Sequence, residues 1–182
     1  MYDSRLQRKP LLRLIIAGLF AALAVALNYA LIAIPQVKLF NLIIFVAGYF
    51  GGIYSGVLAG GIAAAVYSII NPYNMGIFPP LPLLLSQIFC MGIIGASGGF
   101  SRRLNFLSGG KAIQILKAAT IGLVLSAFYN IVVTASGAYL FGTFKEAFIL
   151  AIPAMLLNIA VNIIFFALLL PIIVPLKDKF KI

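Results

Sequence analysis

The sequence predicts an all-α integral membrane protein, with six transmembrane helices in a single domain over residues 1–182. Three observations lead to this prediction. Hydrophobic residues make up 64% of the chain and charged residues only 9%, and the mean hydropathy is +1.17. Uncharged segments long enough to cross a bilayer recur along the chain. Basic residues gather at the ends of these segments, where they set the orientation of a membrane protein.

Short polar or proline-containing segments separate the predicted helices. The Asn71-Pro72 pair ends the third helix, because proline lacks an N–H group and disfavours helix in the residue before it. A basic loop at residues 101–117 separates the fourth helix from the fifth. The six helices are predicted at residues 11–34, 39–52, 53–70, 81–100, 118–140 and 147–174.

The uncharged stretch at residues 39–70 decides the number of helices. As one helix it would be about 48 Å long at ~1.5 Å per residue, whereas a bilayer core is ~30 Å thick. Glycines crowd its middle, so we predict a hinge between Gly51 and Gly56 that joins two short helices. A single crossing would also place the later basic segments on the side opposite the basic N-terminus, against the positive-inside rule.

The distribution of basic residues predicts a protein of the plasma membrane with both termini in the cytoplasm. Of the 13 Lys and Arg residues, only Lys38 and Lys145 fall on the predicted outer side. The net charge of +10 is therefore interpreted as a topology signal and as contact with anionic lipid, and no nucleic-acid partner is expected.

The scarcity of reactive side chains excludes most catalytic chemistry. The chain has no histidine, one cysteine (Cys90) and three acidic residues (Asp3, Glu146 and Asp178). We therefore expect no disulfide, metal site, cofactor or catalytic triad, and no enzymatic activity. The Gly-Lys pair in residues 108–113 lacks the upstream glycine and the following Ser or Thr of a P-loop, so the chain is not expected to hydrolyse ATP by itself.

Small residues line the first predicted helix at a spacing of four. Ala17 and Ala21 form one such pair and Ala22 and Ala26 another, with Gly18 alongside. This pattern lets a second helix approach closely. By spacing alone, packing against the protein's own helices is favoured over docking to a partner.

Polar residues cluster on the predicted outer side, where an amide in hydrocarbon is costly unless it has a partner. Either they tie the helices together by hydrogen bonds, or those near the outer surface converge on a pocket for a small polar ligand. Asn162, deepest in the sixth helix, is expected to be structural. The ten candidate binding residues are Gln36, Lys38, Asn41, Asn71, Tyr73, Asn74, Gln87, Tyr129, Asn130 and Asn158.

The chain resembles the substrate-binding S components of energy-coupling-factor (ECF) vitamin transporters. The resemblance rests on the predicted six helices with both ends inside, the alanine-rich first helix, the short glycine-rich pair and the Asn71-Pro72 cap. It implies capture of a vitamin or related micronutrient from outside, and docking to a membrane coupling partner that carries two cytoplasmic ATPases. It also implies alternating access by reorientation of this subunit in the membrane.

The resemblance carries over two groups of residues. The family's Ala-x-x-x-Ala docking pattern matches Ala17 and Ala21, and Ala22 with Ala26 offers a second register. The family's ligand lies on the outer side, under the loops after the first, third and fifth helices, where most of the ten candidates fall. The ligand itself stays open: a lysine could pair with the carboxylate of pantothenate, biotin or a folate, and the amides and tyrosines suit a flavin equally well.

The main alternative is a small six-helix scaffold protein with no transported ligand, such as a cell-shape or assembly factor. A membrane enzyme acting on lipid and a proton-coupled carrier are disfavoured, because both usually need ionisable groups that the spans lack. We also find no convincing internal repeat, which weighs against the inverted-repeat transporters.

Overall fold

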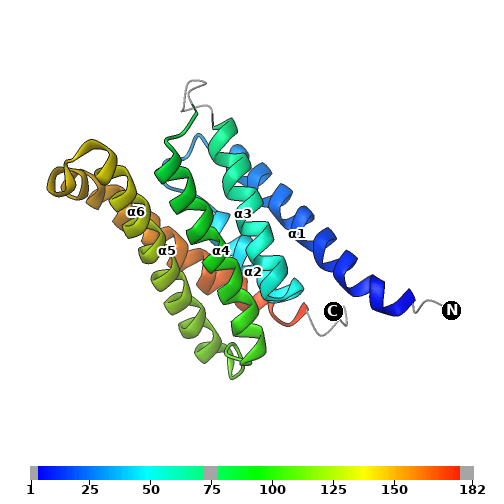
Figure 1. The fold of residues 1–182 in the computed structure, drawn as a ribbon. Coiled ribbons are helices and arrows are strands. Elements are labelled where there is room, and N and C mark those ends of the chain that lie inside the picture. Colours follow the sequence, from blue (N-terminus) through cyan, green and yellow to red (C-terminus); the bar gives the residue numbers. More distant parts are fainter. Residues whose placement is uncertain (1–3, 72–77, 177–182) are drawn as a thin grey trace.

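The computed structural model describes residues 4–71 and 78–176, and within these residues the chain forms six α-helices (Figure 1). Five of them are long and apolar enough to cross a membrane, so the chain is a multi-pass membrane protein. The helices are α1 (Ser4–Ala30), α2 (Phe40–Gly51), α3 (Ile53–Ile70), α4 (Leu81–Arg103), α5 (Lys111–Phe141) and α6 (Phe144–Ile173).

Consecutive helices run in alternating directions, so that two ends of the bundle can be distinguished (Figure 1). One end holds the beginning of α1, the α2–α3 junction, the α4–α5 loop and the end of α6. These segments lie close together, since they line two surface clefts between them. The other end holds the α1–α2 loop and the residues that precede α4. We call these the inner and outer ends, after the predicted topology.

Of the six predicted transmembrane helices, five are long and apolar enough to span a membrane, and α2 is the shorter one. This helix has 12 residues, so it is only about 18 Å long at ~1.5 Å per residue, well short of a ~30 Å hydrocarbon core. It is also buried all round, since every residue from Phe40 to Tyr49 is shielded by the other helices. α2 is therefore enclosed by the other helices of the bundle.

Other predicted bounds are corrected at the helix ends. The first helix ends at Ala30 instead of residue 34, because residues 31–36 form tight turns, with Ile34 N–H donating to Leu31 C=O at 2.9 Å. The fifth begins at Lys111 instead of residue 118, so Lys111 and Lys117 belong to α5 and not to a loop. The third helix matches its predicted bounds, residues 53–70.

Glycines bring the backbones of α2, α3 and α4 into direct contact. A Cβ atom added to Gly95 of α4 would lie 2.0 Å from the carbonyl oxygen of Gly56 on α3. One added to Gly98 of α4 would lie 1.9 Å from the carbonyl oxygen of Phe45 on α2. Only glycine fits at such close approaches.

The predicted hinge between the second and third helices is confirmed and reduces to one residue. Gly52 adopts φ 86°, a conformation that favours glycine, and separates α2 from α3. The guanidinium of Arg102, at the end of α4, donates hydrogen bonds to the carbonyl oxygens of Tyr49 and Phe50. Because the last carbonyls of a helix have no partner within it, Arg102 caps the C-terminus of α2.

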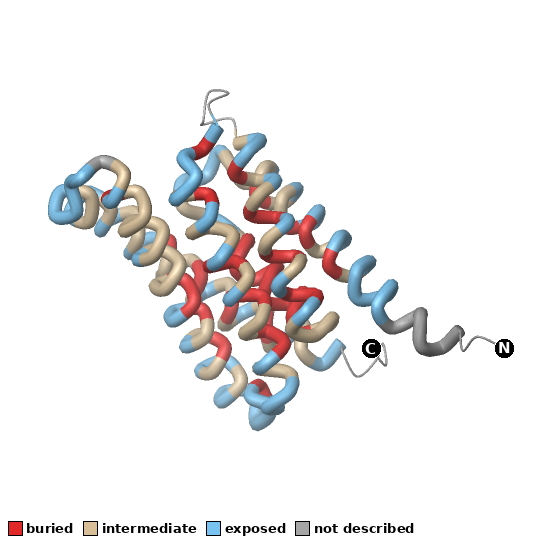
Figure 2. Tube along the Cα trace, in the orientation of Figure 1, coloured by how far each residue is buried: buried red, intermediate tan, exposed pale blue. Residues whose placement is uncertain are grey.

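The buried core surrounds α2 (Figure 2). The rings of Phe45 on α2 and Phe166 on α6 are both fully buried, and their centroids lie 5.6 Å apart in an edge-to-face arrangement. Large apolar side chains such as Leu19, Leu150 and Leu168 are instead exposed on the outside of the bundle. Such a surface suits contact with lipid chains.

Candidate functional site

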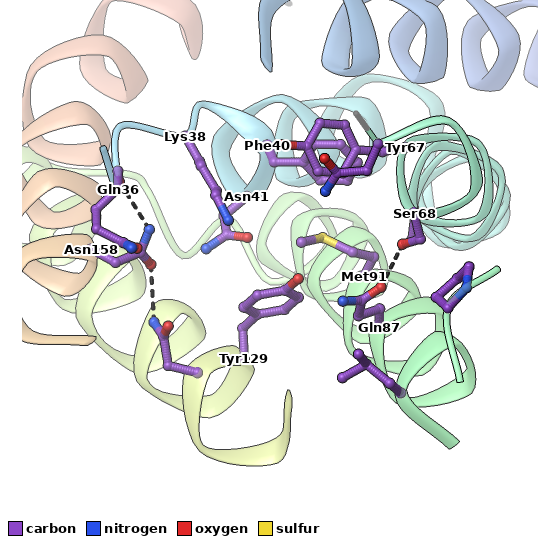
Figure 3. A pocket seen from close by; sticks show the side chains of 15 residues that line it. Gln36, Lys38, Phe40, Asn41, Tyr67, Ser68, Gln87, Met91, Tyr129 and Asn158 are labelled. Atoms are coloured by element: carbon purple, nitrogen blue, oxygen red, sulfur yellow. Dashed lines mark hydrogen bonds between the residues drawn. The ribbon is translucent and has the colours of Figure 1, made fainter. Parts of the chain in front are cut away.

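A cavity of about 130 Å³ lies on the outer side of the bundle (Figure 3). Five helices and the α1–α2 loop contribute to its wall, so its residues are brought together from nearly the whole chain. Eight of the ten candidate binding residues line it: Gln36, Lys38, Asn41, Asn71, Gln87, Tyr129, Asn130 and Asn158. Tyr73 and Asn74 lie outside the described residues.

Seven lining residues were not predicted, and helical spacing could have identified several of them. Tyr67 and Ser68 lie four and three residues before Asn71, and Leu83 and Met91 lie four residues on either side of Gln87. Residues at these spacings share a helix face. The seven are Phe40, Ala64, Tyr67, Ser68, Pro79, Leu83 and Met91.

The loop before α2 forms one part of the cavity wall. The chain before Phe40 is irregular, and Gln36 and Lys38 in this loop line the wall. Gln36 has φ 61°, a conformation that is uncommon for a residue with a side chain and recurs at functional sites.

On one side of the cavity, Asn158 of α6 is the centre of an amide network (Figure 3). Its Oδ1 accepts hydrogen bonds from Nδ2 of Asn130 at 2.9 Å and from Nδ2 of Asn162 at 3.3 Å. Its own Nδ2 donates to the carbonyl oxygen of Gln36 at 3.1 Å. Asn158 therefore ties α5, α6 and the α1–α2 loop together, as the helix-tying interpretation predicts. Asn162 does not line the cavity.

On the opposite side, polar groups remain available to a ligand. Ser68 of α3 donates a hydrogen bond to Oε1 of Gln87 on α4 and so orients the amide. The Nε2 of Gln87 is then the group that could donate to a ligand. Asn41, in the first turn of α2, is buried and lines the cavity. These groups can donate to or accept from a bound molecule.

Lys38 provides the positive charge of the cavity. Its side chain is exposed and lines the wall. Partial desolvation by the surrounding protein groups lowers the pKa of its ammonium group. The described residues place no carboxylate in the cavity wall, so a bound anion would be the natural partner of Lys38. Lys145, the other predicted outer lysine, does not line the cavity.

Aromatic rings form the apolar part of the wall. Tyr67 of α3 packs against Phe40 and against Tyr29, with ring centroids 5.5 Å apart in each pair. Tyr129 of α5 lies across the cavity from Tyr67 (Figure 3). Rings on two sides suit the flat or apolar portion of an organic ligand.

A second cavity of about 320 Å³ adjoins the first behind the α1–α2 loop. The two share Gln36, Lys38, Tyr67 and Asn71 as lining residues. Asn28, which is 2% exposed, lines this second cavity, and its Oδ1 accepts no hydrogen bond from the described residues. A ligand larger than the first cavity could extend into this space.

The predicted docking residues divide into two faces of α1. Ala17 and Ala21 are only 1% and 3% exposed, because α1 packs this face against α2 and α3. Both side chains therefore pack within the chain, and docking of a partner through them stays a prediction. Ala22 and Ala26 are exposed, and nothing lies within 4 Å of a Cβ added to Gly18 on the same surface.

No protein-family model, no curated protein and no solved structure matches this chain. The resemblance to ECF S components therefore stays a prediction. What stands is a helical membrane protein of six helices, five of them long and apolar enough to span a bilayer.

Proposed function

We propose that this chain is the substrate-binding subunit of an ECF-type importer, which captures a vitamin or related micronutrient on the outer side of the plasma membrane. One observation carries the proposal. A cavity gathers Lys38, Asn41 and Gln87 with aromatic rings on two sides, and none of its described lining residues is a carboxylate that could pair with Lys38. Only the Oε1 of Gln87 is used in a hydrogen bond between helices, from Ser68, so its Nε2 can donate to a ligand. A purely structural bundle has no need of such groups in a cavity.

The chemistry of the wall indicates the class of ligand. Lys38 suits a carboxylate, the amides of Asn41 and Gln87 suit ring nitrogens, hydroxyls or carbonyls, and Tyr67 and Tyr129 suit a flat or apolar segment. A small carboxylic acid with a polar ring or amide meets all three requirements. Since only Lys38 of the two outer lysines lines the cavity, the carboxylate is assigned to that residue.

The energy for import would come from partners. The sequence has no P-loop, so a transmembrane coupling subunit with two cytoplasmic ATPases would supply ATP hydrolysis. The exposed Ala22 and Ala26, together with Gly18, offer that partner a smooth helix face. We favour this register over Ala17 and Ala21, whose side chains are buried.

Mass spectrometry of the small molecules retained through purification in mild detergent tests the proposal. We expect a small carboxylic acid at near-stoichiometric yield, and its loss from the Gln87→Leu variant. Lys145→Gln, which changes a lysine outside the cavity, is the matched control and should retain the ligand. A protein that carries no small molecule and binds none from a vitamin panel would instead support the scaffold alternative.

Docking is tested separately by co-purification with the coupling partner. Ala22→Trp with Ala26→Trp should abolish the complex and leave ligand retention intact. The pair Ala17→Trp and Ala21→Trp should lower the stability of the chain itself, because both positions are buried. Unchanged co-purification of the Ala22 and Ala26 variant would rule out this docking face.

The proposed orientation is accessible to thiol labelling in intact cells. Cys90 is buried and can be replaced by serine to give a cysteine-free chain. With a membrane-impermeant reagent, Lys145→Cys should be labelled from outside, and Ser108→Cys only after the cells are opened. The reverse pattern would place the termini outside.

A further inference from the structure

Another cavity lies at the inner end of the bundle, away from the proposed ligand site. It is a cleft of about 680 Å³ between the first turns of α1, the α2–α3 junction and the last turn of α4. Its floor includes Gly51, Gly52 and Gly99, and nothing lies within 4 Å of a Cβ added to Gly52. The cleft is therefore open down to the backbone at this junction.

Three arginines line the cleft, and none of its described lining residues is acidic. Arg13 comes from α1, and Arg102 and Arg103 come from α4. Arg13 and Arg103 are exposed. Glu146, at the start of α6 on the outer side, is the one acidic residue of the described segments, so no described carboxylate lies beside Arg13 or Arg103. The cleft concentrates positive charge and is suited to an anion.

Hydrogen bonds fix the framework that carries these arginines. The guanidinium of Arg102 is held by the carbonyl oxygens at the end of α2. The hydroxyl of Ser55 on α3 donates to the carbonyl oxygen of Arg13 at 3.0 Å and thereby joins α1 to α3. The three arginines are thus presented by helices whose relative positions are fixed, as a preorganised site requires.

The surroundings of the cleft distinguish a lipid from a soluble anion or an acidic peptide. Leu12, Ile16 and Ile53 also line it, and Leu12 is 51% exposed. Leu11 and Ile15 continue an exposed apolar surface along α1. A ligand with an anionic head and an apolar tail would use both the arginines and this surface, whereas a free anion would use only the arginines.

We propose that this inner cleft binds the phosphate head group of an anionic phospholipid, with an acyl chain lying along the apolar face of α1. Arginine forks match the oxygens of a phosphate with paired hydrogen bonds. The inner end of the bundle is the basic end, so the phosphate would come from the cytoplasmic leaflet. The bound lipid would brace α1, the α2–α3 junction and α4 together.

Native mass spectrometry of the purified full chain, titrated with phosphatidylglycerol or phosphatidylcholine, tests the proposal. We expect phosphatidylglycerol to bind more tightly. Each basic residue near a membrane surface contributes roughly a fivefold gain in affinity for anionic lipid, so Arg13→Gln with Arg103→Gln should weaken phosphatidylglycerol binding about 25-fold. Lys145→Gln, at the outer end, should leave it unchanged. Arg102 is kept intact because it caps α2.

Three results would overturn the assignment: equal affinity for the two lipids, unchanged binding by the double variant, or displacement of the lipid by millimolar inorganic phosphate or an oligoglutamate peptide. The last would identify a site for a free anion or an acidic segment instead of a lipid. The variant Arg13→Lys with Arg103→Lys keeps the positive charge but loses the paired hydrogen bonds of the guanidinium groups. It should bind phosphatidylglycerol with intermediate affinity, which would show that the weaker binding of the glutamine variant does not come from misfolding.

Discussion

The α2–α3–α4 unit and the α5–α6 hairpin differ in how closely their helices approach. In the first, glycines place backbone against backbone at several points, so that Gly48, Gly56 and Gly95 leave no room for a Cβ atom. In the second, the close approach is at Gly122, where an added Cβ would lie 2.8 Å from the carbonyl oxygen of Asn162, and amides cross between the helices near the cavity, as in the hydrogen bond from Asn130 to Asn158. A Cβ added to Gly137 of α5 would meet nothing within 4 Å.

The cavity lies on the boundary between these two regions. Asn41 and Gln87 belong to the glycine-packed unit, and Tyr129 and Asn158 belong to the hairpin. The first region fixes one wall by steric contact, which leaves no adjustable distance. The second fixes the other wall by a few hydrogen bonds, whose loss costs less. Substitutions in the two regions should therefore differ in size.

The largest effect is expected where backbones touch. Gly95→Ala places a methyl group 2.0 Å from the carbonyl oxygen of Gly56, and only separation of α3 from α4 relieves that overlap. We expect a loss of about 3 kcal/mol or more in unfolding free energy, measured by denaturant titration in detergent. Gly137→Ala is the matched control in the hairpin and should be neutral or stabilising by up to ~1 kcal/mol. Equal effects would remove the distinction between the regions.

A smaller loss is expected at the inner end of the glycine-packed unit. Arg102→Met removes the donor that caps α2 at Tyr49 and Phe50, so two partly buried carbonyls lose a charged partner. Such hydrogen bonds contribute about 1.5–3 kcal/mol, and the melting temperature should fall accordingly. Arg103→Met, at the adjacent exposed position, should change it little. A similar fall in both variants would mean that charge, and not the cap, stabilises this end.

In the hairpin, Asn158→Leu should cost only about 1 kcal/mol. Nδ2 of Asn130 would still donate to the carbonyl oxygen of Ser126, at 2.7 Å, and hydrogen bonds within membranes are individually modest. Asn162→Leu should be neutral or stabilising, because the Oδ1 of this residue is buried and accepts no hydrogen bond from the described chain. Thermal unfolding of both variants measures the contrast, and a larger loss at Asn162 would contradict it.

The smallest effect on stability is expected at Lys38, where the substitution should stabilise the protein instead of destabilising it. Burial lowers its pKa in the folded protein below the unfolded value of 10.5, so the charged form opposes folding. Lys38→Met should therefore raise the stability of the ligand-free protein near pH 7. The gain should shrink as pH rises through the folded pKa towards 10.5, where the wild-type lysine is neutral in both states. The same variant should weaken binding of a carboxylate ligand, and a gain independent of pH would exclude this origin.

Most helices could be predicted because hydropathy and charge act locally. The bounds of α3 are as predicted, and proline accounts for its end. The end of α1 was misplaced because residues 31–34 are as apolar as a helix yet form turns. The bounds of α2 are within one residue of the predicted 39–52 at each end. Its enclosure was not predicted, because an uncharged run does not distinguish a helix that meets lipid from one enclosed by other helices.

The candidate site was predicted in outline. The rule that buried amides need partners selected Gln87, Asn130 and Asn158, all of which line the cavity. The same rule could not say which amides tie helices together and which remain available. Hydrogen-bond partners can lie more than a hundred positions apart in the sequence, as Asn158 and Gln36 do, and only the folded structure brings them together.

The sequence by itself determined that this is a multi-pass helical membrane protein, where its helices break, and which residue types could meet a ligand. These follow from the cost of burying charge in hydrocarbon and from the limits of glycine and proline. Only the tertiary structure decided that α2 is enclosed, that Ala17 and Ala21 face inward, and that Lys38 shares a cavity with Gln87. The reason is physical: hydropathy records how much surface avoids water, and packing alone decides which surface meets protein and which meets lipid.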